Sequence, residues 1–175
     1  MDRSSDPAGS SSGPVVQKGA DGFCSVRGIF WRAIDPLHRG DALAGSRSAG
    51  RYSRADQPTL YLSSSKEGVA AAMIAHAASR ARELEVVGFD VAASNIVDLR
   101  DAAAAASLGI NPRRAAADWQ ADVAAGRTPP SWRVRDALVA AGANGLIDPS
   151  RKRPGLWHLT LFGWNAPGLP TVRVH

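Results

Sequence analysis

The hydrophobic residues of this chain fall in short segments whose spacing alternates irregularly between the period of a strand and that of a helix. Segments with β-branched or aromatic residues and a period of two predict strands. They lie at 26–34, 59–62, 85–91, 96–99, 144–147, 156–164 and 171–174. Because no regular βαβ repeat connects them, the sequence predicts an α+β fold, a single compact domain with a mixed or antiparallel sheet and flanking helices.

Helices are expected between these strands. They are predicted at 66–82, 102–108, 112–126 and 132–141. Asp101 and Asn111 stand at positions where a side-chain oxygen can cap a helix start, and Pro112 suits a first helical turn. Glycines that follow the predicted helices provide stop signals.

The first residues differ in composition from the rest of the chain. Residues 2–21 are rich in Ser, Gly, Pro and Asp, and they carry too little apolar surface to offset the entropy lost on ordering. We therefore predict a disordered tail over residues 1–22. The remaining residues, 23–175, are expected to form one domain, since a chain of 175 residues that is 45% hydrophobic can build one proper core.

The chain is basic, with a formal net charge of +5 and a pI near 10.1. Such a balance fits nucleic acid, an anionic small ligand or an acidic protein partner. Lys and Arg are spread along the sequence, so no stripe of cations that would follow a DNA backbone is obvious. Nucleic-acid binding is therefore disfavoured, and it stays an alternative in which Trp31, Tyr52 and Trp157 would stack on bases.

Cysteine and histidine usage bears on metal binding and location. Cys24 is the sole cysteine, which excludes an internal disulfide and a cysteine-based metal site. The four histidines lie far apart without companion ligands, so no metal is expected. The N-terminus lacks an apolar secretory signal and no segment resembles a membrane span, so we expect a cytoplasmic protein that does not enter the membrane.

Common catalytic signatures are missing from the sequence. It contains no GxGxxG after a strand, no Walker loop, no HExxH and no GxSxG. The corresponding nucleotide-binding folds and hydrolases are therefore not favoured.

Arginine recurs beside aromatic residues at three places. Arg32 follows Trp31, Arg51 precedes Tyr52, and Tyr61 stands beyond a proline. Guanidinium groups bind phosphates in a bidentate manner and aromatic faces stack on heterocycles, so the pattern suits a dinucleotide. The alternative places the aromatic residues in the core and the arginines in a solvated loop.

A second candidate segment spans residues 142–155, where a predicted strand runs into Ser150 and several cations. A hydroxyl fixed at a strand end can bond a ribose or a phosphate. An ordinary Asp-Pro-Ser turn is the alternative. No His or Asp neighbour marks Ser150 as a nucleophile.

Taken in order, these segments resemble the RES domain, the toxin component of the bacterial RES/Xre toxin–antitoxin family. The similarity covers roughly residues 27–163. Its parts are VRGIFWRAI at 26–34, AGRYSRADQPTLYLS at 49–63, SNIVDLRDA at 94–102, the stretch from LGINP to DALVAAG at 108–142, and GANGLIDPSRKRPGLWHLTLF at 142–162.

The resemblance implies an α+β fold similar to the ADP-ribosyltransferase toxins and an activity that consumes NAD until a cognate Xre-type antitoxin blocks the cleft. By motif, Arg32 and Arg51 would hold the diphosphate of NAD. Tyr61 would stack on or order the nicotinamide side, and Ser150 would bond the ribose or phosphate. Tyr52 occupies the aromatic position beside Arg51, and Arg32, Tyr61 and Ser150 are the implied catalytic set.

The sequence departs from the family at one position. The family's glutamate is expected about eleven residues after Tyr61, where this chain has Ala71, Ala72 and Met73. Glu67 lies more than one turn earlier, at a helix N-terminus, and His76 lies one turn later. A carboxylate in that place would help to activate water, so its loss favours transfer of ADP-ribose to an intracellular protein acceptor over hydrolysis.

Three further readings of the sequence stay open. In the first, the protein is an NAD glycohydrolase or phosphorylase that depletes NAD. In the second, it is a RES-like protein that has become an inactive binding partner. In the third, it is the basic nucleic-acid-binding module described above. In the toxin interpretation, the antitoxin should be acidic at its contact surface, because the predicted cleft lining is rich in arginine.

Overall fold

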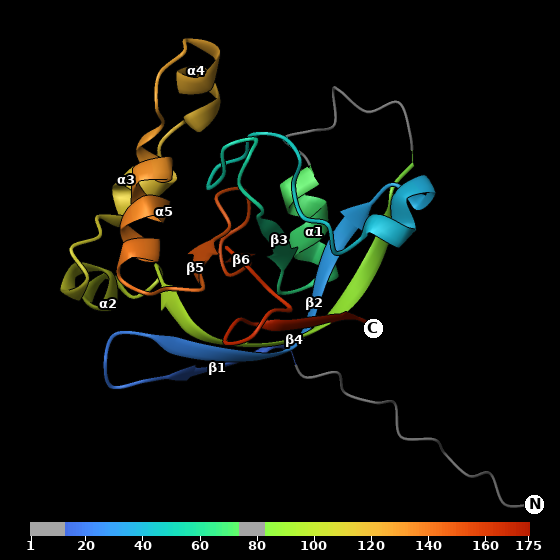
Figure 1. Cartoon of the computed structure of the whole chain (residues 1–175), viewed down its shortest axis with the longest axis horizontal. Coiled ribbons are helices and arrows are strands. Elements are labelled where there is room, and N and C mark those ends of the chain that lie inside the picture. Colours follow the sequence, from blue (N-terminus) through green and yellow to red (C-terminus); the bar gives the residue numbers. More distant parts are fainter. Residues whose placement is uncertain (1–12, 74–82) are drawn as a thin grey trace, which may run out of the picture.

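The described strands join into a closed ring of pairings (Figure 1). In this computed structural model, residues 13–73 and 83–175 are described. The strands are β1 (Val15–Lys18), β2 (Cys24–Ile34), β3 (Leu60–Ser63), β4 (Glu85–Asp98), β5 (Gly145–Pro149), β6 (Trp157–Leu161) and β7 (Thr171–Val174). The ring runs β2–β3–β6–β5–β4 and back to β2, while β1 extends β2 and β7 extends β4. Among the described strands, β4 and β5 alone pair in parallel, so the predicted α+β class with a mixed sheet is confirmed.

The longest ladder joins β2 to β4, antiparallel from Ile34 opposite Glu85 to Cys24 opposite Ile96. The sequence predicted two strands, 85–91 and 96–99, in place of β4. The structure shows one strand, because Ala92 and Ala93 also pair with β2 although they interrupt the hydrophobic pattern. Cross-strand hydrogen bonds thus override a weak local preference.

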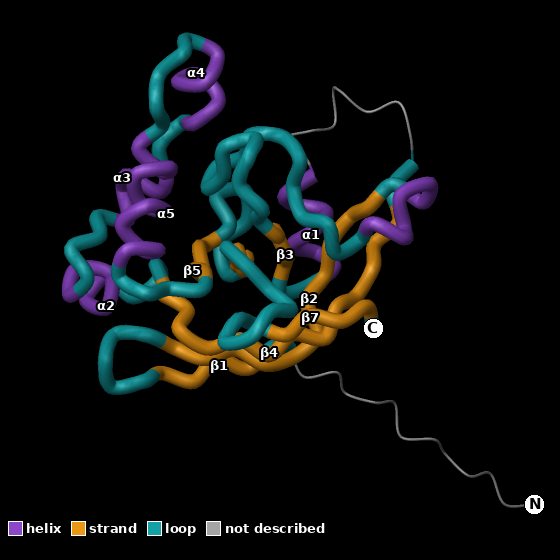
Figure 2. Tube along the Cα trace, in the orientation of Figure 1, coloured by secondary structure: helices purple, strands orange, loops and turns teal. Residues whose placement is uncertain are grey.

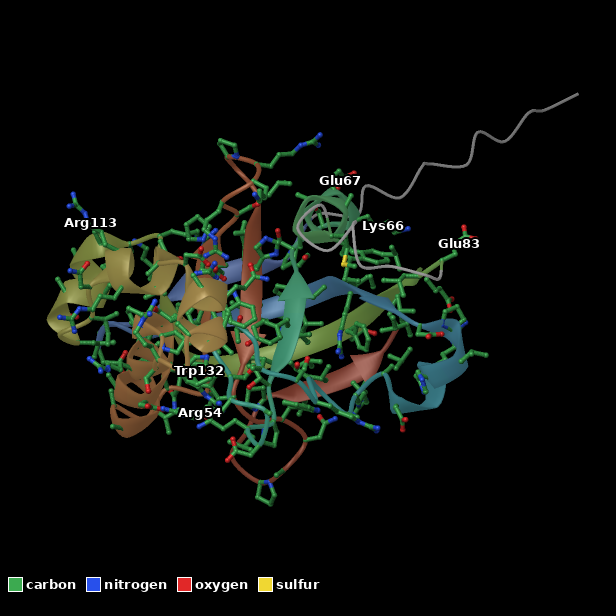
Figure 3. All side chains as sticks on the ribbon, turned by 90° about the horizontal axis from the view of Figure 1, so that it is seen from above. Arg54, Lys66, Glu67, Glu83, Arg113 and Trp132 are labelled. Atoms are coloured by element: carbon green, nitrogen blue, oxygen red, sulfur yellow. The ribbon has the colours of Figure 1, made fainter. Side chains whose placement is uncertain are left out.

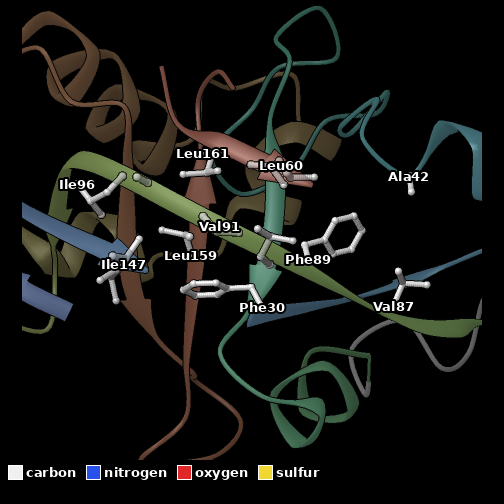
Figure 4. Packing of buried hydrophobic residues seen from close by; sticks show 14 of the residues in the cluster. Phe30, Ala42, Leu60, Val87, Phe89, Val91, Ile96, Ile147, Leu159 and Leu161 are labelled. Carbon is white, nitrogen blue, oxygen red and sulfur yellow. The ribbon is translucent and has the colours of Figure 1, made fainter. Parts of the chain in front are cut away.

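Alternate residues of the ring strands fill its interior, which we call the inner face (Figure 4). Phe30 of β2 lies opposite Phe89 of β4, and neither ring is exposed to solvent. The other fully enclosed inner-face residues are Leu60, Leu62, Ile96, Ile147, Leu159 and Leu161. Because strand side chains alternate, the residues between them point away from this core, to what we call the outer face.

The helices of the described residues are short, and α2, α3 and α5 gather on one side of the ring (Figures 1 and 2). They are α1 (Lys66–Met73), α2 (Ala102–Ser107), α3 (Pro112–Ala116), α4 (Trp119–Ala124) and α5 (Pro130–Ala140), and a 3-10 helix, η1, covers Pro36–Asp41. As predicted, Asp101 caps α2 by accepting hydrogen bonds from the backbone N–H groups of Ala103 and Ala104, both at 3.1 Å. Among these described helices, none has the length and apolar character needed to cross a membrane.

The single helix predicted over 112–126 is wrong. Ala117 adopts an extended conformation, and Asp118 then caps a separate helix, α4, through a bond from the Gln120 N–H. Asp is a strong capping residue, and its side chain competes with continuation of the helix.

A second hydrophobic cluster lies between the outer face and the helices. It contains Tyr52, Val97, Leu99, Ala105, Ile110, Ala115, Val134, Leu138, Ala143 and Leu146. Leu146 of β5 and Leu138 of α5 are both fully buried, so α5 packs against the outer face beside the predicted ligand-binding segments.

The structure differs from the tail predicted over residues 1–22. Val15–Lys18 forms β1, which pairs with β2 from Val15 opposite Arg27 to Lys18 opposite Cys24. The edge of β2 offers unpaired backbone groups there, and Val16 packs against the inner core. Residues 1–12 of the predicted tail lie outside the described residues.

Gly145 offers a test of the β5–β6 junction. A Cβ at this position would collide with the backbone carbonyl oxygen of Thr160. We expect Gly145→Ala to lower the free energy of unfolding by about 1–3 kcal/mol, as overpacking does. Gly40→Ala is the matched control, since nothing lies within 4 Å of its added Cβ. Urea denaturation of both variants measures the difference, and equal stabilities would contradict the register described here.

Candidate functional site

The outer face of β3, β6 and β5 carries polar side chains at consecutive cross-strand positions. Tyr61 lies opposite Thr160, and Ser63 lies opposite His158. His158 in turn lies opposite Asp148. These residues alternate with the inner-face leucines of the same strands, so the pleat of the sheet presents them together on one side.

Tyr61 fixes the loop that contains Arg51. Its hydroxyl accepts a hydrogen bond from the Tyr52 N–H at 3.0 Å and shares another with the Ser53 hydroxyl at 2.9 Å. Burial raises the pKa of Tyr61, so the phenol stays protonated and can serve as a donor. The phenol therefore ties the 50–53 turn to β3.

Tyr52 and Asp148 form a buried polar pair. The Tyr52 ring is 2% exposed, and its hydroxyl donates to Oδ2 of Asp148 at 3.4 Å. Burial raises the pKa of Asp148 from 3.8 to about 6, against the opposing effect of the Arg151 and Arg51 charges. Arg151 Nη1 lies 3.9 Å from Asp148 Oδ2. A buried carboxyl group therefore lies among two guanidinium groups and a phenol.

Arg51 reaches from the loop to the helical side of the molecule. Its Nη1 donates to the carbonyl oxygens of Ala115 and Ala117 at 3.0 and 2.6 Å. Its Nε is buried and finds no hydrogen-bond partner among the described residues. Burial, together with the nearby Arg151 charge, lowers the pKa of Arg51. The guanidinium group is thus held in place against the carbonyl oxygens of Ala115 and Ala117.

Ser150 stands directly after β5, two residues beyond Asp148. It is 9% exposed, and its hydroxyl accepts a hydrogen bond from the Arg153 N–H at 3.3 Å. The segment is thus an ordered turn that links a strand end to several cations. Both readings of the sequence, the turn and the ligand contact, are compatible with this placement.

Arg32 does not join this group. Arg32 lies on the inner face of β2, beside Phe30 and opposite Val87 of β4. Its Nη1 donates to the Ala42 carbonyl oxygen at 3.0 Å. Burial lowers its pKa. Strand alternation separates Arg32 from Tyr61, which a sequence motif read without register cannot reveal.

Trp31, the neighbour of Arg32, lies on the outer face. It is paired with Ser63 of β3, and Nζ of Lys66 lies 4.4 Å from the centre of its ring. Trp157, by contrast, packs edge-on against Phe30, and Tyr52 is buried. The three aromatic residues that the nucleic-acid alternative required are therefore not on one exposed surface.

At the position where the resemblance places a glutamate, the structure has the buried Ala71 and the exposed Ala72 of α1. Glu67 lies in the first turn of the same helix (Figure 3). Bonds from its own backbone and from Ser65 lower its pKa, as expected for a helix N-terminus. His76 lies outside the described residues.

Hollows elsewhere on the surface lack this chemistry. One of about 550 Å³ is lined by residues of β1, β2, β4 and β7, and another of about 280 Å³ by residues of α3, α5 and the segment just before α3. Neither is lined by Arg51, Tyr61 or Ser150. The titratable groups converge instead on the outer face of β3, β6 and β5, and such convergence is typical of functional sites.

The described part of the chain contains neither a cluster of metal ligands nor an activated thiol. No three His, Cys, Asp or Glu side chains in residues 13–73 and 83–175 gather to hold a metal ion. Cys24 is buried, and burial raises the pKa of its thiol to about 11. A thiol so rarely ionised makes a poor nucleophile.

Comparison with known proteins decides the family. The family model of the RES domain matches residues 29–175. The chain belongs to the RES-domain family. A chain of the M. tuberculosis MbcT–MbcA toxin–antitoxin complex has a similar structure, with a TM-score of 0.51 and 17% sequence identity, covering 92% of this chain and 84% of that chain. At this identity the likeness shows a shared fold. The search of curated proteins found no match.

Within this RES domain, Asp148, His158 and Ser63 were missed as site residues by sequence reasoning. His158 lies inside the strand predicted over 156–164, between Trp157 and Leu159, so alternation alone carried a usable signal for it. Asp148 lies one residue beyond the strand predicted over 144–147, and only the observed β5 includes it. Only the pairing of β5, β6 and β3 puts the three residues in one row.

The raised pKa of Asp148 predicts a pH effect on the stability of the RES domain. The folded state binds more protons than the unfolded state between pH 3.8 and about 6, so Asp148 lowers stability as pH rises through this window. Asp148→Asn removes the effect. We expect the free energy of unfolding of this variant, relative to wild type, to increase by up to about 3 kcal/mol from about pH 4 to about pH 7.

Asp136→Asn is the control for this measurement. A hydrogen bond from Arg54, which is labelled with its neighbour Trp132 in Figure 3, lowers the pKa of Asp136. The stabilising effect of the Asp136 carboxylate is therefore lost in acid. The stability of this variant relative to wild type should therefore change with pH in the opposite direction. Denaturant titrations at both pH values measure the two changes in the free energy of unfolding. Changes of the same sign in the two variants would refute the raised pKa assigned to Asp148.

Proposed function

We propose that this RES domain is the toxin of a toxin–antitoxin pair and that it cleaves the bond between nicotinamide and ribose in NAD. The observation that carries the proposal is the grouping of Arg51, Arg151, Tyr61 and Ser150 around the β3–β6–β5 outer face. Family membership supports the toxin assignment.

Charge favours a diphosphate ligand. Arg51 and Arg151 are both close enough to Asp148 for their charges to oppose the rise of its pKa. One buried carboxyl group with a pKa of about 6 neutralises only part of the positive charge of these two guanidinium groups. Phosphate oxygens would satisfy both guanidinium groups.

The remaining residues suit the sugar and the rings. The Tyr61 phenol would order the nicotinamide side, and the Ser150 hydroxyl would bond a ribose or phosphate. Tyr52 would act through Asp148, because its ring is buried and its hydroxyl is bonded to that carboxyl group. Arg32, an expected diphosphate contact, would instead support the Ala42 segment from the inner face.

Cleavage of the nicotinamide–ribose bond depends more on the positioning of NAD than on a strong acid or base. Nicotinamide in NAD is a cationic leaving group, so the electron pair of the breaking bond neutralises its ring and positive charge develops at the ribose carbon. Holding the diphosphate and ribose fixed would align that carbon with a nucleophile. The favoured acceptor is a side chain of an intracellular protein; water or inorganic phosphate is the alternative.

An acidic antitoxin would complement this site. The exposed arginines around it, together with the net charge of +5, favour a partner whose contact surface is negative. Blocking the face that carries Tyr61 and Ser150 would stop NAD from entering.

One experiment tests the proposed function and distinguishes transfer of ADP-ribose from hydrolysis or phosphorolysis. The RES domain is expressed in cells, and NAD levels and protein-bound ADP-ribose are measured by mass spectrometry at the same time. Loss of NAD with modified protein supports transfer, and loss of NAD alone supports hydrolysis or phosphorolysis. Growth arrest with unchanged NAD and no modified protein would overturn the proposal.

Arg51→Ala tests the site. The loss of a charge-assisted hydrogen bond to a phosphate should reduce NAD consumption roughly 10- to 100-fold and relieve growth arrest. Arg54→Ala is the matched control three residues along, because Arg54 pairs with Asp136 and lies over Trp132. Its NAD consumption should stay near wild type. Circular dichroism checks folding, and a well-folded Arg51→Ala protein with full activity would refute the assignment.

A further inference from the structure

One row of side chains crosses four strands on the outer face. Asp148 of β5 lies opposite His158 of β6, His158 lies opposite Ser63 of β3, and Ser63 lies opposite Trp31 of β2. Directly opposed residues of neighbouring strands have their Cβ atoms about 4.5–5.5 Å apart. His158 therefore stands in the centre of the proposed site, between the carboxyl group and the tryptophan.

A hydrogen bond holds the His158 ring. The Ser63 hydroxyl and Nδ1 of His158 are 3.0 Å apart, and Ser63 is 5% exposed. When Nδ1 carries the proton and donates to the serine oxygen, Nε2 presents a lone pair. Among the described residues, Nε2 has no hydrogen-bond partner, and the side chain is half-buried rather than enclosed.

The surroundings keep the imidazole neutral. Burial lowers the pKa of His158, and the positive charge of Arg151 lowers it further. The other ionisable groups on the elements around it are Asp148 of β5, Tyr61 of β3, and Lys66 and Glu67 of α1. Lys66 lies over the neighbouring Trp31. A neutral imidazole can accept a proton, while a protonated one cannot.

We propose that His158, positioned by Ser63, is the proton acceptor of the NAD-cleaving site. This inference rests on the proposed function and adds the group that receives the proton. The nucleophile's oxygen forms a bond to the ribose carbon as the carbon–nitrogen bond to nicotinamide breaks. The electron pair of that bond goes to the nicotinamide nitrogen, and the proton of the attacking O–H passes to Nε2 of His158.

His158→Gln is the decisive variant, since glutamine keeps a polar side chain but cannot take up the proton. We expect kcat for NAD cleavage to fall by about 10²-fold or more, the usual contribution of a general base, with little change in the dissociation constant for NAD. His38→Gln is the control, because His38 is an exposed residue of η1. Its rate and affinity should equal those of wild type.

The pH profile separates His158 from Asp148. Wild-type kcat should decrease as pH falls below the pKa of His158, which lies below its ordinary value of 6.5. This acid limb should persist in Asp148→Asn and be absent from the residual activity of His158→Gln. An acid limb that disappears in Asp148→Asn instead would assign the proton to the carboxyl group and overturn the proposal.

Ser63→Ala provides a second route if His158→Gln fails to fold. Removing the hydroxyl frees the imidazole tautomer, so kcat should decrease and the acid limb should shift while NAD affinity is kept. An unchanged rate and pH profile in Ser63→Ala, or wild-type kcat in folded His158→Gln, would refute the role of His158. Calorimetry that detects no NAD binding to the wild-type protein, with no NAD consumed, would refute the proposed function itself.

Discussion

The packing of apolar side chains inside the strand ring determines where everything else lies. Phe30 and Phe89 meet across β2 and β4, and leucines of β3 and β6 complete the core. Since side chains alternate along a strand, filling the inner face commits the residues between them to the outer face. Tyr61, Ser63, His158 and Asp148 are grouped by that constraint, and a register slip in any of these strands would scatter them.

The site contains buried polar groups that lower the stability of the fold and hold the neighbouring side chains in fixed positions. Asp148 is buried beside Arg51 and Arg151, and it is not matched by an ideal ion pair, because the nearest guanidinium nitrogen of Arg151 is 3.9 Å away. A buried carboxyl group in this setting costs free energy. Functional sites often retain such groups, which supports reading this cluster as a binding site rather than as part of the core.

The sequence predicted much of the fold and named candidate residues for the site. The α+β class, most of the strands and the Asp101 cap followed from local patterns. Of the residues that the motif implied, Tyr52 is bonded to Tyr61 through its backbone and to Asp148 through its hydroxyl. Local patterns failed where pairing decided the outcome. Val15–Lys18 became a strand because β2 offered an edge, and the helix predicted over 112–126 broke where Asp118 caps a new one.

By itself, the sequence determined the RES family, the alternation of the strands and the identity of the arginine and tyrosine residues available to bind a ligand. Only the tertiary structure decided which of them meet. It placed Arg32 on the inner face, away from Tyr61, and brought Asp148, His158 and Ser63 into one row. The physical reason is that local sequence sets the period of each strand, whereas register between distant strands depends on how the whole core packs.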